Sequence, residues 1–166
     1  MVIRVAQVLA LGLLLFGCST TRVEQGVFYS GKGYQVKLPQ DGWRIQPGGK
    51  ADLELRRDAP PGGMLVDATC EGNELGRTLP VLARHLTFGL SERVTVENTT
   101  EAVAGRQAAH AVVRGSLDGS PVAVEAFVFK GPRCVHDFLY VAPAEEFEAG
   151  RRDFRALVES FTGETR

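Results

Sequence analysis

The sequence lacks a hydrophobic run long enough to span a membrane and lacks an excess of charge of either sign. Among 166 residues, 19 are Lys or Arg and 20 are Asp or Glu, which gives a formal net charge of -1. Without a basic patch or a long charge run, no nucleic-acid partner is expected. The three cysteines and three histidines show no close spacing of the kind that zinc ligands have, so no metal or other cofactor is expected.

The first residues have the layout of a secretory signal. Arg4 precedes an apolar run, residues 5–16, which is shorter than the roughly 20 residues that a spanning helix needs. Leu15-Phe16-Gly17-Cys18 resembles the bacterial lipobox, although Phe16 is bulkier than the residue usual at its position. The resemblance implies that residues 1–17 are a lipoprotein signal peptide and that Cys18 is acylated. A retained membrane anchor is the alternative.

The residues after Cys18 predict where the protein is held. Ser19 follows the cysteine, and in a Gram-negative cell the lipobox resemblance then implies an outer-membrane lipoprotein that faces the periplasm. Several acyl chains, such as palmitate, would anchor it firmly to the bilayer, since one chain alone binds only marginally. Residues 18–26 are polar and without periodicity, and they predict a short tether that reaches at most about 28 Å. Residues 27–162 are then a single domain.

Two cysteines remain once Cys18 carries lipid. Cys70 and Cys134 lie in a chain expected in an oxidising compartment, so we expect a disulfide between them. The chain-entropy relation predicts that closing this loop stabilises the fold by roughly 4 kcal/mol. Two separate buried thiols are the alternative.

The pattern of apolar residues predicts strands on both sides of a helix in mid-chain. Alternation of apolar and polar side chains indicates strands, and the Asp118-Gly119 pair is a strong signal for a hairpin. The expected strands cover residues 34–38, 43–45, 52–55, 64–70, 93–97, 106–114, 121–129 and 135–141. Residues 58–63, rich in Pro and Gly, predict a loop.

Helical spacing predicts two helices. Leu82, Leu86 and Leu90 share one face of a helix over residues 80–90. Pro143 and the acidic residues after it predict the start of the final helix. The order of elements predicts an α+β fold, in which helices cover an antiparallel β-sheet.

Two segments resemble the PsbP-like family. Tyr34-Gln35-Val36-Lys37-Leu38-Pro39 followed by Trp43 is similar to the family's opening strand, and Leu157-Val158-Glu159-Ser160-Phe161 is similar to its close. The resemblance covers roughly residues 27–161 and implies a compact α/β/α sandwich. It carries over no catalytic residues, and it implies a role in binding other proteins or assisting assemblies.

The candidates for chemistry have simpler explanations. His85, His110 and His136 fall on separate predicted elements, and His136 and Asp137 should point to opposite faces of a strand. Asp52 and Glu54 would form either a carboxylate pair or a solvated face. Trp43, the single tryptophan, is either an exposed binding anchor or, as we expect, a core residue.

These observations favour a non-enzymatic accessory or protein-binding lipoprotein of the cell envelope. Its expected partners are the lipid bilayer, through Cys18, and another envelope protein. A carrier or sensor of a small apolar ligand is the alternative, because the same apolar helix faces could enclose one. An enzyme built on His110, His136 and nearby carboxylates is the third hypothesis.

Overall fold

The computed structural model describes residues 21–72 and 74–163. The expected signal peptide, residues 1–17, and the expected acylation site Cys18 lie outside these residues. The strands are β1 (Arg22–Glu24), β2 (Val27–Tyr29), β3 (Gln35–Lys37), β4 (Arg44–Ile45), β5 (Leu53–Asp58), β6 (Pro61–Thr69), β7 (Ser91–Val103), β8 (Arg106–Leu117), β9 (Ser120–Lys130) and β10 (Val135–Pro143). The helices are η1 (Glu74–Gly76), α1 (Leu79–His85) and α2 (Phe147–Glu159).

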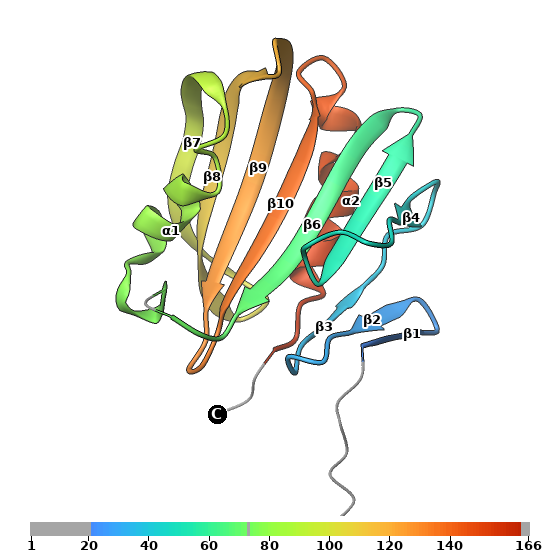
Figure 1. Ribbon diagram of the computed structural model, residues 1–166, viewed down its shortest axis with the longest axis vertical. Helices are drawn as coiled ribbons and strands as arrows, with labels where there is room; N and C mark the ends of the chain where they lie inside the picture. Colours follow the sequence, from blue (N-terminus) through green and yellow to red (C-terminus); the bar gives the residue numbers. More distant parts are fainter. Residues whose placement is uncertain (1–20, 73, 164–166) are drawn as a thin grey trace, which may run out of the picture.

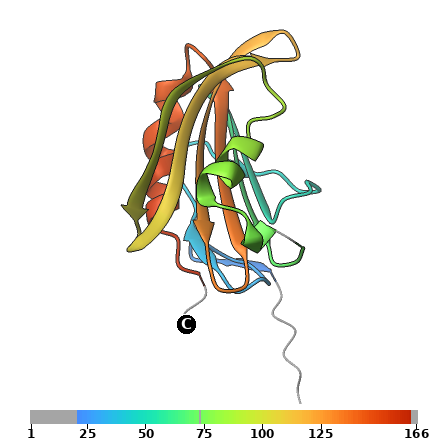
Figure 2. The ribbon, with the colours of Figure 1, turned by 90° about the vertical axis from the view of Figure 1, so that its left-hand side faces the viewer.

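A large antiparallel sheet dominates the fold. Its seven strands follow the order β4-β5-β6-β10-β9-β8-β7, and a small sheet of order β1-β2-β3 lies at one end of it (Figure 1). The two α-helices, α1 and α2, lie on opposite sides of the large sheet, as the view along its edge shows (Figure 2). The predicted α+β class, an antiparallel sheet covered by helices, is confirmed.

Helix α2 covers one face of the large sheet and closes the main core. Phe147, Phe154 and Leu157 of the helix are buried against Phe138 and Tyr140 of β10. The three α2 residues share one face of the helix, and the two β10 residues, two positions apart, share one face of the strand. Both elements therefore present apolar surfaces to each other.

Helix α1 covers only part of the other face. Leu82 and Ala83 of α1 pack on Ala109 of β8, Val128 of β9 and Val135 of β10. The helix is shorter than predicted, because residues 86–90 leave the helical path. The N–H groups of Thr87 and Phe88 donate to carbonyls three residues earlier, so the chain turns more tightly there.

Two hairpins replace predicted irregular segments. Residues 58–63 were predicted as a loop, but Asp58 pairs with Pro61, and β5 and β6 continue almost to the turn. The expected tether, residues 18–26, contains β1, which pairs with β2 across a turn at Gln25 and Gly26. Both turn residues have positive φ, 48° and 76°, which allows a two-residue hairpin turn.

Pro143 ends β10, and the final helix begins at Phe147, four residues later than predicted. The predicted hairpin at Asp118-Gly119 is confirmed, with Leu117 paired to Ser120. Within residues 21–72 and 74–163, no helix is both long and apolar enough to span a bilayer.

Candidate functional site

The face of the large sheet opposite α2 is only partly covered, and we call its bare part the open face. Strands β5 and β6, the later part of β10 and the beginning of β9 lie beyond the reach of α1 (Figure 1). Leu65 of β6 and Leu139 and Val141 of β10 are partly exposed there. These residues alternate with the core residues of the same strands, so the strand period places apolar side chains on both faces of the sheet.

A groove of about 680 Å³ lies on the open face, open to solvent along one side. Its apolar floor is formed by Leu65, Leu139 and Val141, and Gly63 lies directly opposite Val141 in the pairing of β6 with β10. Because Gly63 has no side chain, the floor is hollow at this point. Charged side chains line the rim: Glu54, Arg56 and Asp58, all of β5. We call this feature the open groove.

One carboxyl lies on the open face next to the floor. Asp137 precedes Leu139 by two residues on β10, so both side chains point to the same side. It pairs directly with Asp67 of β6, and its Oδ1 has no hydrogen-bond partner among the described residues. Burial raises the pKa of Asp137 to about 7, with further contributions from the nearby carboxylates of Asp67 and Glu74.

A lysine connects the two sheets beside this carboxyl pair. Lys32 Nζ lies 2.8 Å from Asp52 Oδ1 and 3.2 Å from Asp67 Oδ1, and it also donates to the carbonyl of Ala68. The Asp52 carboxylate accepts a further hydrogen bond from Tyr34 Oη at 3.0 Å. Burial lowers the pKa of Lys32, but the hydrogen bonds and charges of Asp52 and Asp67 outweigh it and raise the pKa overall.

The structure decides between the two alternatives for Asp52 and Glu54. They lie opposite Leu53 and Leu55 and are partly exposed, as expected of the solvated face, but they form no carboxylate pair, because each has its own partners. Asp52 precedes β5 and accepts from the Ala68 N–H at 3.1 Å, whereas Glu54 accepts from the N–H groups of Lys50 and Ala51.

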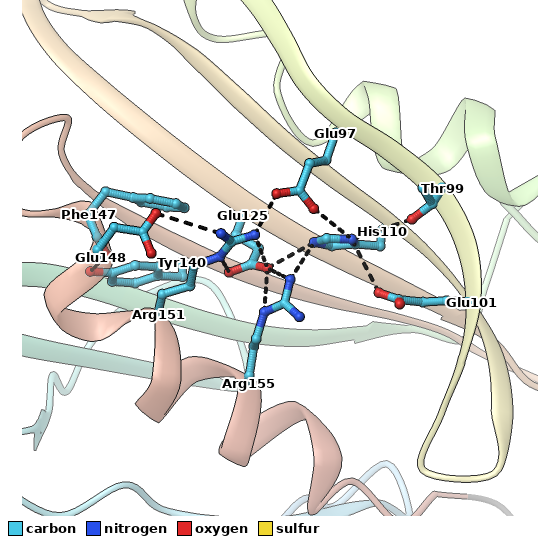
Figure 3. A network of polar contacts seen from close by, with 10 residues as sticks. All are labelled: Glu97, Thr99, Glu101, His110, Glu125, Tyr140, Phe147, Glu148, Arg151 and Arg155. Carbon is cyan, nitrogen blue, oxygen red and sulfur yellow. Dashed lines mark hydrogen bonds and ion pairs between the residues drawn. The ribbon is translucent and has the colours of Figure 1, made fainter.

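The face under α2 carries a group of charges with a buried centre and a partly exposed margin, which we call the charged network: Glu97, Glu101, His110, Glu125, Arg151 and Arg155 (Figure 3). Glu125 is fully buried at its centre. Its carboxylate accepts from Arg155 Nη2 at 2.6 Å and from Arg151 Nε at 3.1 Å, and it lies 2.8 Å from His110 Nε2. Burial alone would raise the pKa of Glu125, but these hydrogen bonds lower it below the ordinary value.

His110 is fully engaged within this network. Its ring stacks on Phe127 at 4.3 Å, and its Nδ1 lies 3.2 Å from Glu101 Oε1. With both nitrogens beside carboxylates and only 2% of the residue exposed, His110 has no nitrogen directed toward a substrate. The arrangement suits a role in stability better than one in acid–base catalysis.

The other histidines lie far from this network in the fold. His136 is buried between the rings of Tyr34 and Phe161, on the face opposite Asp137, as strand alternation predicts. His85 ends α1 and contacts Arg77 and Phe88. In the part of the chain that the structure describes, no three His, Cys, Asp or Glu side chains group in a way that could hold a metal ion.

The predicted cysteine pair lies at the end of β6 and the start of β10. The structure joins Cys70 to Cys134 by a disulfide, which links the two strands that form the groove floor at their far ends. Trp43 is buried, with its Nε1 donating to Asp153 at 3.0 Å and with the Arg57 guanidinium over its ring. It is a core residue, as expected.

Sequence patterns missed the charged residues of the interior. Glu125 interrupts an otherwise apolar strand segment, Val122 to Phe129. This pattern could have indicated a buried ion pair, since a lone acid in a buried strand requires a cationic partner. Arg151 and Arg155 recur at helical spacing on α2 and supply it. Arg57 is only 6% exposed, but its burial could not be predicted from the sequence, because charged residues precede and follow it in β5.

Comparison with known proteins shows similarity in structure alone. No protein-family model matches the chain, and no curated protein sequence matches it. A cyanobacterial PsbP, CyanoP from Synechocystis sp. PCC 6803, superposes with a TM-score of 0.56 at 13% identity, over 90% of this chain and 99% of that chain. The fold is thus PsbP-like, as the sequence resemblance implied.

Two further structures share this fold. LpqN of Mycobacterium tuberculosis, described as involved in cell envelope biogenesis, has a TM-score of 0.56 at 16% identity, over 78% of this chain and 84% of that chain. A protein of Bacteroides thetaiotaomicron has a TM-score of 0.58 at 7% identity over 80% of this chain. The match covers 46% of the Bacteroides chain, so this chain spans less than half of that protein.

Proposed function

We propose that this protein is a lipid-anchored, non-enzymatic accessory module of the bacterial envelope that binds another envelope protein. The observation that carries the proposal is the open groove, an apolar hollow on a sheet face that α1 leaves bare. Apolar surface of this kind, bordered by charged residues, is typical of sites that another molecule covers.

The anchor follows from the lipobox resemblance at Cys18. An acylated cysteine close to the domain would hold it at a membrane surface, where an accessory protein meets envelope assemblies. The PsbP-like fold is compatible with this role, and one protein that shares it, LpqN, is described as involved in cell envelope biogenesis. Fold similarity by itself does not assign a function, so the groove remains the main support.

The absence of an enzymatic role is part of the proposal. The buried His110 has both ring nitrogens beside carboxylates of the charged network. The crevice beside that network, about 340 Å³, is lined by Glu101, Phe127, Arg155 and Glu159 but not by the histidine. Among the described residues, this crevice therefore does not join His110 to a nucleophile.

A carrier of a small apolar ligand is the second candidate function. The volume of the open groove, about 680 Å³, lies within the range of small-molecule sites. However, such sites usually enclose most of their ligand, whereas this groove is open along one side. The open shape therefore favours a protein segment as the occupant, because the rest of the bound protein can shield the apolar floor from solvent.

The direct test is crosslinking of tagged full-length protein in intact cells, followed by mass spectrometry of the membrane fraction. We expect one abundant envelope protein to be captured by the native chain and lost with Cys18→Ala, because the variant has no lipid. Recovery of the lipoprotein alone, with an apolar small molecule in its extract, would contradict the proposal and favour the carrier.

A further inference from the structure

The open groove and the N-terminal end of the domain lie at opposite ends of β6. The Pro61 end of this strand lines the groove, whereas Lys32, near the N-terminus, contacts Asp67 and Ala68 at the other end. Thr21 Oγ1 in turn accepts a hydrogen bond from the Gly31 N–H at 3.3 Å. The groove lining on β6 runs from Pro61 to Leu65, and a strand rises about 3.3 Å per residue, so Gly63 in mid-groove lies about 13 Å from Asp67 along the strand.

This separation matters for an anchored protein, and the argument rests on the proposed acylation of Cys18. Only two residues lie between Cys18 and Thr21, so the tether spans at most about 10 Å. With the domain upright, the groove therefore lies away from the bilayer and faces an envelope partner. The expected tether through residue 26 would have allowed far more freedom.

A domain lying on its side would still hold the groove away from a flat bilayer. Helix α1 and the connection between β4 and β5, residues 46–52, project from the same side of the sheet as the open face (Figure 2). A flat surface would meet these two projections before it reached the floor. A narrow protein segment fits between the projections.

The floor and the carboxyl beside it define the chemistry of that segment. Val141, Leu139 and Asp137 follow one another at two-residue spacing on one face of β10. An occupant lying along the strand would meet apolar surface first and then an acidic group. Asp137 faces the carboxylates of Asp67 and Glu74, while the neighbouring ammonium, Lys32, is bound to Asp52 and Asp67. Asp137 lies just outside the groove lining and its Oδ1 is buried, so a long basic side chain of the occupant is needed to bring a cation to this carboxyl.

We infer that the open groove docks a segment of an envelope protein that lays apolar side chains on Leu65, Leu139 and Val141 and places a lysine or arginine beside Asp137. Burial of the floor supplies the affinity, and the pairing at Asp137 fixes the register of the segment. Burial, together with the carboxylates of Asp67 and Glu74, raises the pKa of Asp137 to about 7, which agrees with this assignment because a cation beside Asp137 would offset these effects.

Site-specific photo-crosslinking in intact cells tests the inference. A photoreactive residue replaces Leu139 on the floor or, as the matched control, Arg152, which is 93% exposed on α2 on the other side of the sheet. We expect a protein adduct from position 139 and not from 152, with the crosslinked peptide carrying apolar residues next to a lysine or arginine. Asp137→Asn should lower the yield about fivefold, the effect of losing one ion pair. If the 139 variant does not fold, position 65 replaces it.

Other outcomes overturn the inference. A phospholipid adduct or a second copy of this chain at position 139 would identify a different occupant. If Asp137→Asn left the yield of the crosslinked adduct unchanged, the occupant would not place a lysine or arginine beside Asp137. A protein adduct from position 152 alone would leave the accessory role intact but move the docking surface to α2. The lack of a protein adduct at every position would contradict the proposed function itself.

Discussion

Glu125 is the residue on which the buried charges of the protein converge. Its carboxylate has no exposure and receives hydrogen bonds from Arg151 and Arg155 beside His110. Removing one member of a buried ion pair leaves the other charges without compensation, and this loss exceeds the net value of the intact pair.

We therefore predict that Glu125→Gln lowers the free energy of unfolding by about 3 kcal/mol at neutral pH. Because the pKa of Glu125 is lowered in the folded state, its stabilisation is present above its ordinary pKa and is lost as the pH falls through the folded value. The difference between the native chain and the variant should thus shrink in acid. Denaturant unfolding at several pH values measures it.

Glu148→Gln is the matched control. This carboxylate lies 3.6 Å from the same Arg151 but is 73% exposed, so the substitution should change stability by less than about 1 kcal/mol. A loss for Glu148→Gln as large as that for Glu125→Gln would show that burial does not set the strength of these pairs.

Asp137 has the opposite dependence on pH. Its pKa is raised from 3.8 to about 7, so between these values the folded state binds more protons than the unfolded state and stability falls as the pH rises. We predict that Asp137→Asn gains stability relative to the native chain over this window, by up to about 4 kcal/mol above pH 7. Near pH 4 the side chain at position 137 is neutral in both folded proteins. The difference in their free energies of unfolding at this pH therefore gives the part of the substitution's effect that does not depend on ionisation. If the free energies of unfolding of the two proteins changed in parallel with pH, the raised pKa of Asp137 would be contradicted.

At the scale of elements, helix α2 approaches β10 closely because of one glycine. A Cβ added at Gly150 would lie 2.4 Å from Tyr140 Oη and 2.7 Å from its Cζ, and Tyr140 is fixed by donating to the Phe147 carbonyl at 3.0 Å. We predict that Gly150→Ala destabilises the fold by about 1–3 kcal/mol, although alanine is the better helix former. Gly89→Ala, where no atom lies within 4 Å, should cause no such loss. Thermal unfolding compares the two variants, and equal melting temperatures would contradict the close approach.

The disulfide joins two neighbouring strands that are distant in the sequence. Cys70 and Cys134 are 64 residues apart, so their bond restricts a large loop of the unfolded chain. We predict that Cys70→Ser combined with Cys134→Ser lowers stability by up to about 4 kcal/mol without preventing acylation of Cys18. Guanidinium unfolding with and without a reducing agent measures this. An unchanged midpoint in the double variant would show that the bond is absent in solution or does not contribute.

Local signals in the sequence were sufficient for most of the large sheet. Alternation located the strands from β5 to β10, and Asp118-Gly119 located the β8–β9 hairpin, because both depend on neighbouring residues alone. The short strands β1 and β2 were missed, since three residues carry too little alternation. The end of the first helix and the start of the final helix were misplaced, because Leu90 and Pro143 fit a helix locally whereas the structure places them outside α1 and α2.

The candidate site depended on information that the local sequence does not carry. Leu65, Leu139 and Val141 look like core residues in the sequence, and only the limited extent of α1 leaves them partly exposed. The directly opposed carboxyls of Asp67 and Asp137 require the register of β6 with β10. Long-range pairing therefore creates both the groove and its acidic neighbour.

At the scale of the whole molecule, the protein has two distinct ends. Residues 21–32 lie at one end of the large sheet (Figure 1). The disulfide joins β6 and β10 at that end, and the open groove lies toward the Pro61 end of β6. With Cys18 acylated, the first end would face the bilayer and the groove would face a partner. The central claim is that this groove, rather than the α2 side, carries the binding function.

The most direct test of this claim measures partner capture by a variant whose new side chain fills the groove without disturbing the fold. A Cβ at Gly63 would meet Val141 Cγ1 at 3.6 Å, an ordinary contact, so Gly63→Phe should keep the native melting temperature while its ring occupies the hollow. We predict that tagged full-length Gly63→Phe remains in the membrane fraction but captures at least about tenfold less of the partner than the native chain does. The control Arg152→Glu, on the exposed side of α2, should capture it normally. Undiminished capture by a folded, membrane-bound Gly63→Phe would contradict the account.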